Sequence, residues 1–577
     1  MNDSANPSTS VRLSTRPVPA KAARALQDAG FDQVLARLFA ARGVEDAREI
    51  SADVKDLLKP DGLMGLSRAA DTLAQAVLNQ EPCCVVGDYD CDGATATAVM
   101  VAGLKKLGAK VDYLVPNRFT DGYGLSPNVV QAACQHPRLG KPRWLITVDN
   151  GIASIAGAES ARENQIGVII TDHHLPGDQL PRVQAIVNPN QNGCEFPSRH
   201  LAGVGVAFYV LAAVRAALRR AGQPDQALPP LVNLLDLVAL GTIADLVPLD
   251  ANNRRLVGAG LARIKAGKAC AGINALLQVA GVAVHQTSVR DLGFALGPRI
   301  NAAGRLDDIS MGIECLLAQS EASALAIAEQ LDAINRQRRE IETDMRESAL
   351  TAIETPDPTQ MSLVLFQPDW HEGVVGLVAG RLKDRFFRPT FAFAPAAGEP
   401  GRLRGSGRSI AGIHLRDALA LVDARHPGLI DRFGGHAMAA GLSLPETGLA
   451  DFESAIEQAI ADIASPEAMN AEVKTDGSLT ASDLKLSLVH AIDQHIWGQG
   501  FPAPVFCNQF RVLRQRIVGS GHLKLDLALD GREIPAIYFQ RREPLAEHPW
   551  LAYTVQANEY RGRTELQLLI QAVGQPG

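Results

Sequence analysis

Residues 83–93 read CCVVGDYDCDG, an apolar run suited to a buried strand that ends in three aspartates within five positions. Two further apolar runs, in RWLITVDN and GVIITDHH, also end in acids, and Ala-rich stretches of helical character separate the runs. This alternation predicts βαβ units and a parallel sheet covered by helices on both faces. Because ligands bind at the carboxyl ends of the strands in such sheets, we expect the acids to meet in one crevice.

The acids and imidazoles at these predicted strand ends form a candidate metal centre. They are Asp88, Asp90, Asp92, Asp149, Asp172, His173 and His174, joined by Asp245 after the apolar run LVNLLDLVALGTIA. Taken singly, an aspartate after a strand is more often a turn or helix-capping residue, and a histidine pair is more often structural. Three acids within five residues, however, repel one another unless a cation neutralises them. Carboxylates with one or two imidazoles suit Mn²⁺ or Mg²⁺.

The composition of the chain sets limits on its class. Its 577 residues suggest about three to five domains, and 46% apolar with 21% charged residues is typical of a globular protein. The eight cysteines form no CxxC pair, which argues against a zinc site or a disulfide framework. The N-terminus has no apolar signal segment, and residues 231–249 carry two acids, so we expect a buried helix, no membrane span and a cytoplasmic protein.

The net charge of −7, from 56 basic and 63 acidic residues, argues mildly against a polyanionic partner. The charge is unevenly distributed, however. Residues 381–416 contain eight Lys or Arg and only two acids, a local charge of +6. This segment is therefore a candidate contact for a nucleic-acid strand.

Texture along the chain predicts an α/β protein with five parts. They are a flexible tail (1–19), a catalytic parallel-sheet domain with a helical N-terminal part (20–319), a long linker helix (320–355), a second α/β domain (356–466) and an all-β barrel or sandwich (467–577). The linker helix is expected because residues 320–354 contain neither Gly nor Pro and a Pro-containing segment closes them.

The motifs resemble those of a known superfamily. DYDCDG, VDNG, TDHH and GTIADLVPL, in this order, are similar to the four motifs of the DHH phosphoesterases, and WHEGVVGLVAGRL, GSGRS and FGGHAMAAGL resemble the DHH-associated substrate-binding domain. Together with GPRINAAGR (297–305) and a C-terminal region that resembles an OB-fold, the chain is similar to the single-stranded-DNA-specific 5′→3′ exonucleases of this superfamily. The resemblance covers about residues 60–577.

The resemblance implies a catalytic set and two divalent cations, Mn²⁺ or Mg²⁺. The implied metal ligands are Asp90, Asp92, Asp149, His173 and Asp245, with Asp149 bridging. Asp88 and Asp172 are either ligands or residues that orient the histidines, and His174 faces the substrate phosphate. The two cations would activate a shared water for in-line attack on phosphorus, and 5′-mononucleotides would be released.

The resemblance also implies contacts to the strand and its 5′ end. The candidates are Arg118, Arg299, Arg305, Arg408, Ser409, Gly434, Gly435 and His436. Arginines bind a terminal phosphate with two hydrogen bonds, and glycine-rich loops allow close backbone approach. Alternatively, Arg299 or Arg305 pairs with a nearby acid, and the two glycines form a tight turn. Aromatic residues of the last domain either stack on bases or fill its interior.

Two other functions remain open at this point. A DHH phosphodiesterase for short oligonucleotides or cyclic dinucleotides would need the same metals but would leave the all-β domain unexplained. A non-catalytic scaffold on this fold should have lost its metal acids, all of which are present. For the exonuclease, the resemblance implies single-stranded DNA with a 5′ end, a single-stranded-DNA-binding protein and a RecQ-type helicase as partners in recombination and repair. A monomer suits the expected domains.

Overall fold

The computed structural model describes residues 11–116, 124–353, 359–465, 468–469, 471–519, 521–560 and 562–577. The chain divides into two compact units. The first, here called the parallel-sheet unit, comprises Arg48–Arg338 and Ile496–Pro502. The second comprises Met1–Ala47, Arg339–His495 and Ala503–Gly577. The predicted substrate residue Arg118 lies outside the described residues.

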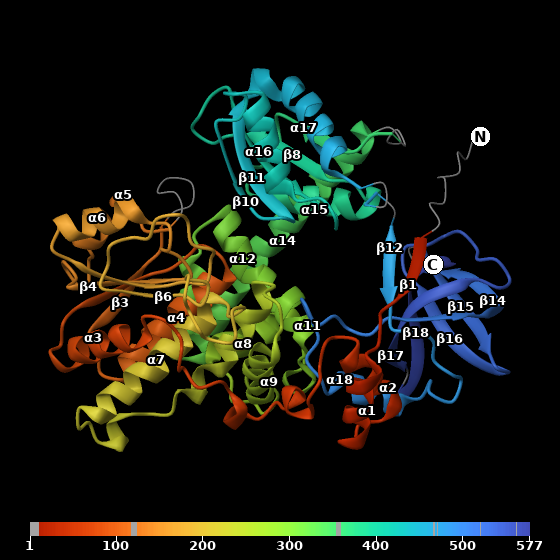
Figure 1. Cartoon of the computed structure of the whole chain (residues 1–577), viewed down its shortest axis with the longest axis horizontal. Helices are drawn as coiled ribbons and strands as arrows, with labels where there is room; N and C mark the ends of the chain where they lie inside the picture. Colours follow the sequence, from red (N-terminus) through yellow and green to blue (C-terminus); the bar gives the residue numbers. More distant parts are fainter. Residues whose placement is uncertain are drawn as a thin grey trace. The chain divides into compact units, whose positions relative to one another are not determined.

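The parallel-sheet unit is built on five parallel strands, as predicted (Figure 1). In spatial order they are β3 (Val111–Leu114), β2 (Cys83–Val86), β4 (Trp144–Val148), β5 (Gly167–Thr171) and β6 (Ala185–Val187). All four residues of β2 are buried, as are the last four of β4 and of β5. Such continuous burial is typical of a parallel sheet with both faces covered, where β-branched and other apolar side chains face a helix layer on either side.

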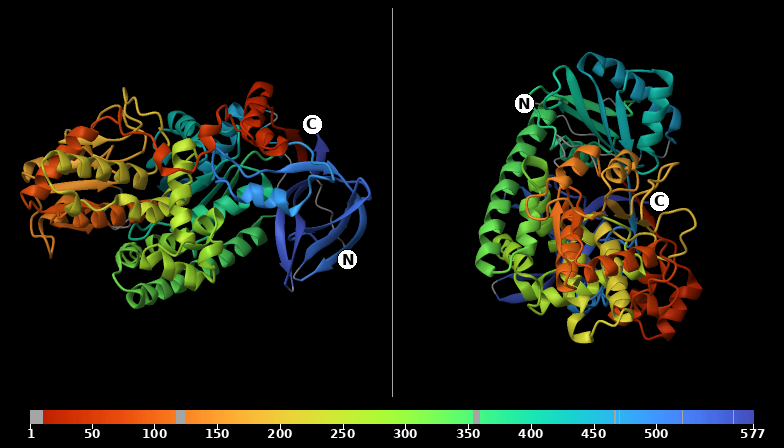
Figure 2. Two further views of the ribbon diagram at one scale, coloured as in Figure 1. Left: turned by 90° about the horizontal axis from the view of Figure 1, so that it is seen from below. Right: turned by 90° about the vertical axis from the view of Figure 1, so that its left-hand side faces the viewer.

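Helices cover both faces of this sheet. One face packs on α5 (Pro127–Cys134) and α6 (Ile155–Glu163), with Val129, Val130 and Ala161 against Val86 and Ile170. The other face packs on α3 (Leu66–Leu78), α4 (Cys91–Lys106) and α7 (Gly203–Arg220) (Figures 1 and 2). The carboxyl ends of β2, β4 and β5 therefore lie at one edge of the sheet, where the loops that carry the predicted metal residues begin.

The rest of this unit is helical. Its further helices are α8 (Leu235–Ala244), α9 (Ala251–Lys265), α10 (Ala271–Ala280), α11 (Val289–Asp291), α12 (Gly297–Leu306) and α13 (Ser310–Leu317). One stretch, Asp225–Ala244, is long and apolar enough to cross a membrane, but 67% of its most apolar window is buried inside the fold. Its helix α8 packs against α4, α7 and α9, which makes it a core helix of this unit, as the two acids in the sequence suggested.

The helix α14 (Glu321–Ala352) occupies most of the range in which a linker helix was expected, and Figure 2 (right) shows it as the long green helix. The division between the units falls within it, between Arg338 and Arg339. Beyond α14 a second, mixed sheet has the order β10-β11-β9-β8-β7. Its elements are β7 (Leu363–Phe366), α15 (Val375–Phe386), β8 (Thr390–Pro395), β9 (Arg402–Arg408), α16 (Leu415–Arg425), β10 (Arg432–Gly435), β11 (Ala439–Pro445) and α17 (Leu449–Ile463).

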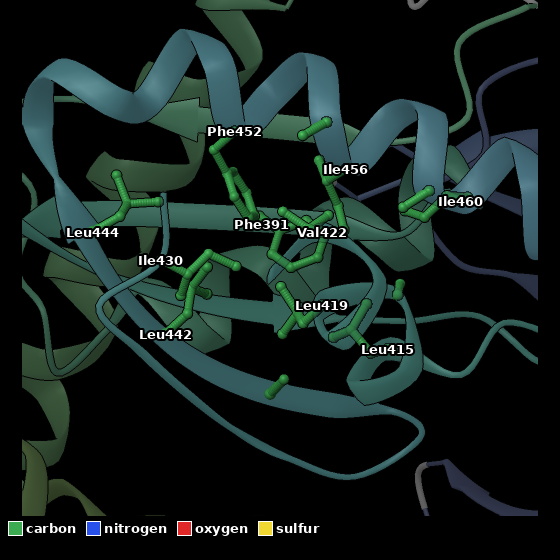
Figure 3. Close-up of a cluster of buried hydrophobic side chains, with 14 of the residues drawn as sticks. Phe391, Leu415, Leu419, Val422, Ile430, Leu442, Leu444, Phe452, Ile456 and Ile460 are labelled. Atoms are coloured by element: carbon green, nitrogen blue, oxygen red, sulfur yellow. The ribbon is translucent and has the colours of Figure 1, made fainter. Parts of the chain in front are cut away.

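The core of this second sheet lies between its strands and the helices α16 and α17. Figure 3 shows Phe452 and Ile456 of α17 above Phe391 of β8, with Leu419 of α16 below. Two glycines of β9 serve this core, because a Cβ at Gly405 would lie 2.3 Å from the Phe393 ring and one at Gly407 would lie 2.7 Å from the Phe391 ring. The glycines of GSGRS are thus strand residues that make room for phenylalanines.

The last domain is an eight-stranded sheet with the path β12-β1-β18-β16-β15-β14, on which β17 pairs with β13 and β18. Its C-terminal elements are β12 (Glu472–Thr475), α18 (Leu486–Asp493), β13 (Phe506–Gln509), β14 (Arg511–Val518), β15 (His522–Leu529), β16 (Arg532–Tyr538), β17 (Trp550–Tyr560) and β18 (Arg563–Pro576). This strand-rich architecture confirms the predicted all-β domain.

The prediction of a flexible tail over residues 1–19 is wrong for β1 (Val11–Thr15). This strand pairs in parallel with both β12 and β18, and its Leu13 is buried beside Cys507 and Ala552 (Figure 1). The helices α1 (Ala20–Asp28) and α2 (Gln33–Ala40) likewise group with the second unit, and not with the catalytic domain as expected. The polar sequence VRLST gives no local sign of this, because the partners of β1 lie more than 450 residues away in the chain.

Candidate metal centre and substrate contacts

The DYDCDG motif connects β2 to α4 and turns its acids inward. Asp90 is the N-cap of α4, and its carboxylate accepts a hydrogen bond of 3.0 Å from the Gly93 N–H. Asp92, 1% exposed, accepts hydrogen bonds of 2.6 and 3.0 Å from the first N–H groups of α7, at Gly203 and Val204. The positive end of the α7 dipole thereby holds a carboxylate that burial would otherwise disfavour.

Asp149 lies directly after β4 with a φ of +62°, a left-handed conformation uncommon for a residue other than glycine. It is 2% exposed, and its Oδ1 lies 3.0 Å from Nε2 of His173. A Cβ at Gly203 would lie 2.5 Å from the Asp149 Cβ, so only glycine fits there. This requirement for Gly203 was not recognised from the sequence.

Asp172 organises the two histidines that follow it. Its Oδ1 accepts hydrogen bonds from the backbone N–H groups of His173 (2.7 Å) and His174 (3.1 Å) and lies 2.8 Å from Nδ1 of His174. Its Oδ2 accepts from the Ile152 N–H at 2.8 Å. Of the two roles left open for this residue, its contacts fit the one that orients histidines.

Three groups of ligand atoms converge at the strand ends, and one of them, Asp149–His173–His174, shares a residue with each of the other two. In one of those two, carboxylate oxygens of Asp88, Asp90 and Asp149 lie within 4.8 Å of one another. In the other, atoms of Asp92, His173 and Asp245 do so, and the His173 Nε2 lies 3.5 Å from the Asp245 Oδ2. These last two atoms are buried and have no hydrogen-bond partner among the described residues. Buried polar atoms without partners destabilise a fold, so their presence here indicates that a ligand belongs between them.

The electrostatics of the centre also fit the binding of cations. Burial raises the pKa of Asp88 to about 8, with a further contribution from the charge of Asp90. Burial and the neighbouring carboxylates likewise raise the pKa values of Asp92 and Asp149, and burial raises that of Asp245. An oxygen-rich set with one imidazole matches the preferences of Mg²⁺ and Mn²⁺, and bound cations would hold these groups in their charged forms.

The two histidines differ in charge preference. Burial lowers the pKa of His173, which favours the neutral imidazole that a metal requires. For His174 burial acts in the same direction, but the hydrogen bond to Asp172 and the nearby carboxylates outweigh it and raise the pKa to about 9. The raised pKa favours the protonated form of His174, which suits an anionic group of a substrate.

The motif GPRINAAGR forms α12, which abuts the metal loop. Asn301 Oδ1 accepts a hydrogen bond of 2.8 Å from the Cys91 N–H, and Gly304 approaches the Tyr89 carbonyl so closely that a Cβ would lie 2.2 Å away. Arg305 is half-buried beside this contact. The side chain of Asn301, which positions the acid loop, was not singled out from the sequence.

Arg299 has a structural partner. It is 7% exposed, forms an ion pair of 2.8 Å with Asp332 of α14 and donates to the Ala295 carbonyl at 2.6 Å. This ion pair agrees with the alternative interpretation that Arg299 pairs with an acid. The phosphate contact at Arg299 stays a prediction, and it would require the guanidinium to leave Asp332.

In the second unit, Arg408 ends β9 beside the first turn of α15. Its Nη1 donates to the Ser406 hydroxyl at 2.8 Å, and a Cβ at Gly376 of α15 would lie 2.8 Å from its Nη2. Arg402 and Arg404 on the same face of β9 pair with Asp431 and Glu399, whereas Arg408 has no acidic partner in the described part of the chain. An uncompensated guanidinium, a hydroxyl and an uncapped helix N-terminus together suit a phosphate.

Part of the +6 charge of residues 381–416 is compensated in the folded protein by acids outside the segment. Arg381 pairs with Glu342, Arg402 with Asp431 and Arg404 with Glu372. The interpretation of the whole segment as a basic surface for DNA is therefore too broad. Arg408 is the member whose surroundings fit an anion.

Ser409 does not face a ligand. Its side chain is 1% exposed, its hydroxyl donates to the Ile413 carbonyl at 2.8 Å, and its N–H donates to the Met438 carbonyl. The predicted substrate contact at Ser409 is thus wrong, and Ser406, which was not singled out, lies beside Arg408 instead. The sequence alone could not distinguish Ser406 from Ser409. Residues of a strand alternate between its two faces, so the even-numbered residues of β9 can be assigned to the open face only after the position of the strand is known.

The glycines of FGGHAMAAGL belong to the β10–β11 hairpin. Gly435 has a φ of +140°, and the turn closes through a hydrogen bond of 2.8 Å from the His436 N–H to the Ala439 carbonyl. The tight-turn reading is therefore correct for Gly435. Gly434 and His436 are exposed, and no atom lies within 4 Å of a Cβ at Gly434, so this side of the hairpin is open to a ligand.

The aromatic residues of the last domain divide into two groups. Phe506 and Phe510 are at most 1% exposed and pack around Tyr553, so they fill the interior. Tyr538 and Phe539 lie at the other end of the sheet, where a cavity of about 610 Å³ is lined by His522, Tyr538, Arg541 and Arg542 among others. Phe539 is 49% exposed and contacts His522 edge-on, and Arg541 lies over the Tyr538 ring.

Comparison with known proteins agrees with this site. Three family models match the chain: "DHH family, N-terminal domain" over residues 82–242, "DHHA1 domain" over residues 360–462 and "RecJ OB domain" over residues 475–572. The acid and imidazole cluster lies within or just beyond the first match. Fold and site thus define a metal-dependent phosphoesterase of the DHH family.

More specific relatives follow from the full-length comparison. The chain is 47% identical over 556 residues to the single-stranded-DNA-specific exonuclease RecJ of Escherichia coli K12, which covers 94% of this chain and 95% of that protein. The corresponding exonuclease of Thermus thermophilus is 33% identical over 522 residues, 86% of this chain and 71% of its own length. The crystal structure of RecJ with Mn²⁺ from this organism superposes with a TM-score of 0.82 over 98% of this chain and 80% of the other, at 29% identity. The chain belongs to the RecJ family of exonucleases.

Proposed function

We propose that this protein degrades single-stranded DNA from its 5′ end and releases 5′-mononucleotides, with two divalent cations, Mn²⁺ or Mg²⁺, at the strand ends of the parallel sheet. The observation that carries the proposal is a set of three ligand groups, of which Asp149–His173–His174 shares Asp149 with Asp88–Asp90–Asp149 and His173 with Asp92–His173–Asp245. The connecting atoms, Asp149 Oδ1 and His173 Nε2, are 3.0 Å apart. Asp149 would therefore serve both cations of a two-metal site.

The roles of the residues follow from their surroundings. Asp90, Asp92, Asp149, His173 and Asp245 would hold the cations, with Asp88 as a further ligand in the group with Asp90 and Asp149. When bound, the cations supply an activated water for attack on phosphorus and compensate the charge of the phosphate. Asp172 holds both histidines in place, and the positively charged His174 would bind a phosphate oxygen next to the bond that is cleaved.

End recognition would rest on arginines outside the acid cluster. Arg408 with Ser406 at the start of α15 fits a terminal 5′-phosphate, because the guanidinium and the helix N-terminus act on the same anion. The other candidates for this contact are Arg305 beside the metal loop and Gly434 and His436 on the open side of their hairpin. Arg118 stays a candidate from its motif alone.

The all-β domain would hold the strand. Its cavity combines two arginines with His522 and Tyr538, and Phe539 is exposed beside it, a combination that binds single strands by base stacking and phosphate contacts. For the cell, we infer a cytoplasmic enzyme of recombination and repair that meets its substrate with a single-stranded-DNA-binding protein and a RecQ-type helicase.

Digestion of end-labelled single strands tests the proposal. With Mn²⁺ present, a 5′-labelled oligonucleotide should release labelled mononucleotide at once, and a 3′-labelled one only after the strand has been consumed. Duplex DNA of the same sequence should be resistant. Early release from the 3′-labelled strand would reverse the polarity, and cleavage of dinucleotides without cleavage of the long strand would favour a phosphodiesterase for short substrates.

A further inference from the structure

A short segment between two parts of the second unit belongs to the parallel-sheet unit. Residues Ile496–Pro502, with the sequence IWGQGFP, group with the parallel-sheet unit, although the residues on either side group with the other. The segment, here called the strap, closes on itself through hydrogen bonds between Gly498 and Phe501 of 2.9 and 3.1 Å. Its ring pair is stacked, with the Trp497 and Phe501 centroids 5.2 Å apart and an interplanar angle of 16°.

The strap packs on the loop that follows Asp245. The Leu249 N–H donates to the Gln499 carbonyl at 2.7 Å. A Cβ at Gly498 would lie 2.7 Å from Cδ1 of Leu249, and one at Gly500, where φ is +70°, would lie 3.0 Å from Cβ of Pro248. Both glycines are therefore needed for this close approach.

Arg254 of α9 fastens the same loop from the other side. Its Cζ lies 4.0 Å from the centroid of the Phe501 ring, a favourable cation–π geometry. Its Nη1 donates to the Leu249 carbonyl at 2.7 Å, and its Nη2 donates to the Glu49 carbonyl at 2.9 Å. One guanidinium thus joins the strap, the loop and the start of this unit.

The first residue of the loop after Asp245 is exposed and strained. Asp245 ends α8, and Leu246 next to it has a φ of +61° and is 68% exposed, so its side chain contributes no core contact. A non-glycine residue in the left-handed region is strained and persists only where its surroundings fix it. The next anchors along the chain are Pro248 and Leu249, which are held by the strap, by Arg254 and by Asn253, whose Nδ2 donates to the Pro248 carbonyl at 3.0 Å.

We infer that the strap is a positioning element for Asp245: by fixing Pro248 and Leu249 it keeps the Asp245 carboxylate at the His173 side of the metal centre. The inference rests on the proposed ligand role of Asp245. Trp497 and Phe501 act through the loop and touch no substrate. The strap lies between α18 and β13 in the sequence but groups with the parallel-sheet unit that carries the cation site.

Manganese binding to the full-length protein without DNA tests the strap, with free Mn²⁺ followed by electron paramagnetic resonance. Trp497→Ala should raise the Mn²⁺ dissociation constant of the site that contains Asp245 about 10-fold, the lower end of the effect of removing a group that holds a metal ligand. Trp497→Phe keeps a ring on Phe501 and should bind Mn²⁺ within about 2-fold of the parent. Phe501→Leu, which keeps bulk but removes the ring facing Arg254, gives a second reading should Trp497→Ala not fold.

Trp550→Ala is the matched control, because Trp550 is also half-buried but lies in β17 of the all-β domain. It should lower the melting temperature and leave Mn²⁺ affinity unchanged. Unaltered Mn²⁺ binding in both strap variants would overturn the inference. Asp245→Asn separates the two hypotheses: if it too binds Mn²⁺ like the parent, the ligand role of Asp245 fails, and if it alone loses binding, only the strap fails.

Discussion

The acid cluster of the parallel sheet and the Arg408 corner of the second sheet are opposite in charge but alike in design. At the first, Asp88, Asp90 and Asp149 bring carboxylates within 4.8 Å of one another. At the second, the Arg408 guanidinium lies beside the positive end of a helix without an acidic partner in the described part of the chain. Each region holds buried or half-buried charge of one sign without a balancing charge of the other sign.

Charges that serve the fold look different. Arg42 and Asp476, each with a side chain 1% exposed, form two hydrogen bonds of 2.8 and 2.9 Å, and Asp476 also accepts from the Val505 N–H. In such a buried pair each charge is compensated by the other, so no ligand is needed. The comparison teaches that a buried charge without a counter-charge points to a ligand of opposite sign: cations at the acid cluster and a phosphate at Arg408.

The acid cluster should be the more sensitive region. Asp149→Asn keeps the side-chain shape but removes the shared charge, and it should lower kcat on single-stranded DNA by at least about 10³-fold, or roughly 4 kcal/mol of barrier. Binding of the strand, measured by fluorescence anisotropy, should change little. Asp112→Asn is the matched control, since Asp112 is a buried acid on β3 of the same sheet that pairs with Arg138. If Asp149→Asn and Asp112→Asn lowered kcat equally, the loss would follow from removal of any buried acid of the sheet and would not be specific to the acid cluster.

Asp172 extends the comparison to a residue that holds the centre without belonging to any of the ligand groups. Asp172→Asn replaces an acceptor of four N–H groups by an amide, which should weaken Mn²⁺ binding or activity by about 10- to 100-fold. The substitution should also lower the pKa of His174, because in the parent protein the hydrogen bond to the Asp172 carboxylate raises it. An NMR titration of the His174 ring measures this shift, and an unchanged pKa would contradict the assigned role.

The Arg408 corner should show its effect on the 5′ end alone. Arg408→Ala should raise KM for a 5′-phosphorylated strand about 10-fold, as expected for loss of a charge-assisted hydrogen bond of roughly 1.5 kcal/mol. A 5′-hydroxyl strand should be unaffected. Arg402→Ala on the same face of β9 is the control, because Arg402 already pairs with Asp431. An equal rise for both ends would assign Arg408 to general strand binding.

The two regions also differ in how far the sequence reveals them. The acid cluster could be predicted because parallel strands place their carboxyl ends together, so spacing in the sequence becomes proximity in space. The Arg408 corner could be predicted only in part, because Ser406 contacts Arg408 whereas the Ser409 hydroxyl is turned inward to the Ile413 carbonyl, a difference that depends on the strand. Asn301, Gly203 and β1 were missed because their roles depend on contacts made by distant segments.

The smallest predicted effect is the pH dependence of the protein's stability. It tests directly whether the carboxylates of the acid cluster lack a counter-charge in the metal-free protein. In the metal-free protein the raised pKa of Asp88, about 8, and the raised values of Asp92 and Asp149 mean that the folded state retains protons which the unfolded chain releases above about pH 4. The stabilising contribution of these protons is complete below that pH and is lost as the pH rises towards 8. Cations compete with the same protons, so Mn²⁺ should raise Tm by a few degrees more at pH 8 than at pH 6.

Asp88→Asn supplies the control for this pH effect, because the amide does not titrate and removes one of the repelling charges. In this variant the fall in Tm of the metal-free protein between pH 6 and pH 8 should be smaller, as measured by scanning calorimetry with a chelator present. A parent protein whose Mn²⁺-dependent shift is the same at both pH values would show that the carboxylates are already charged without metal. The acid cluster would then need a counter-charge from within the chain, and its contrast with the Arg408 corner would be lost.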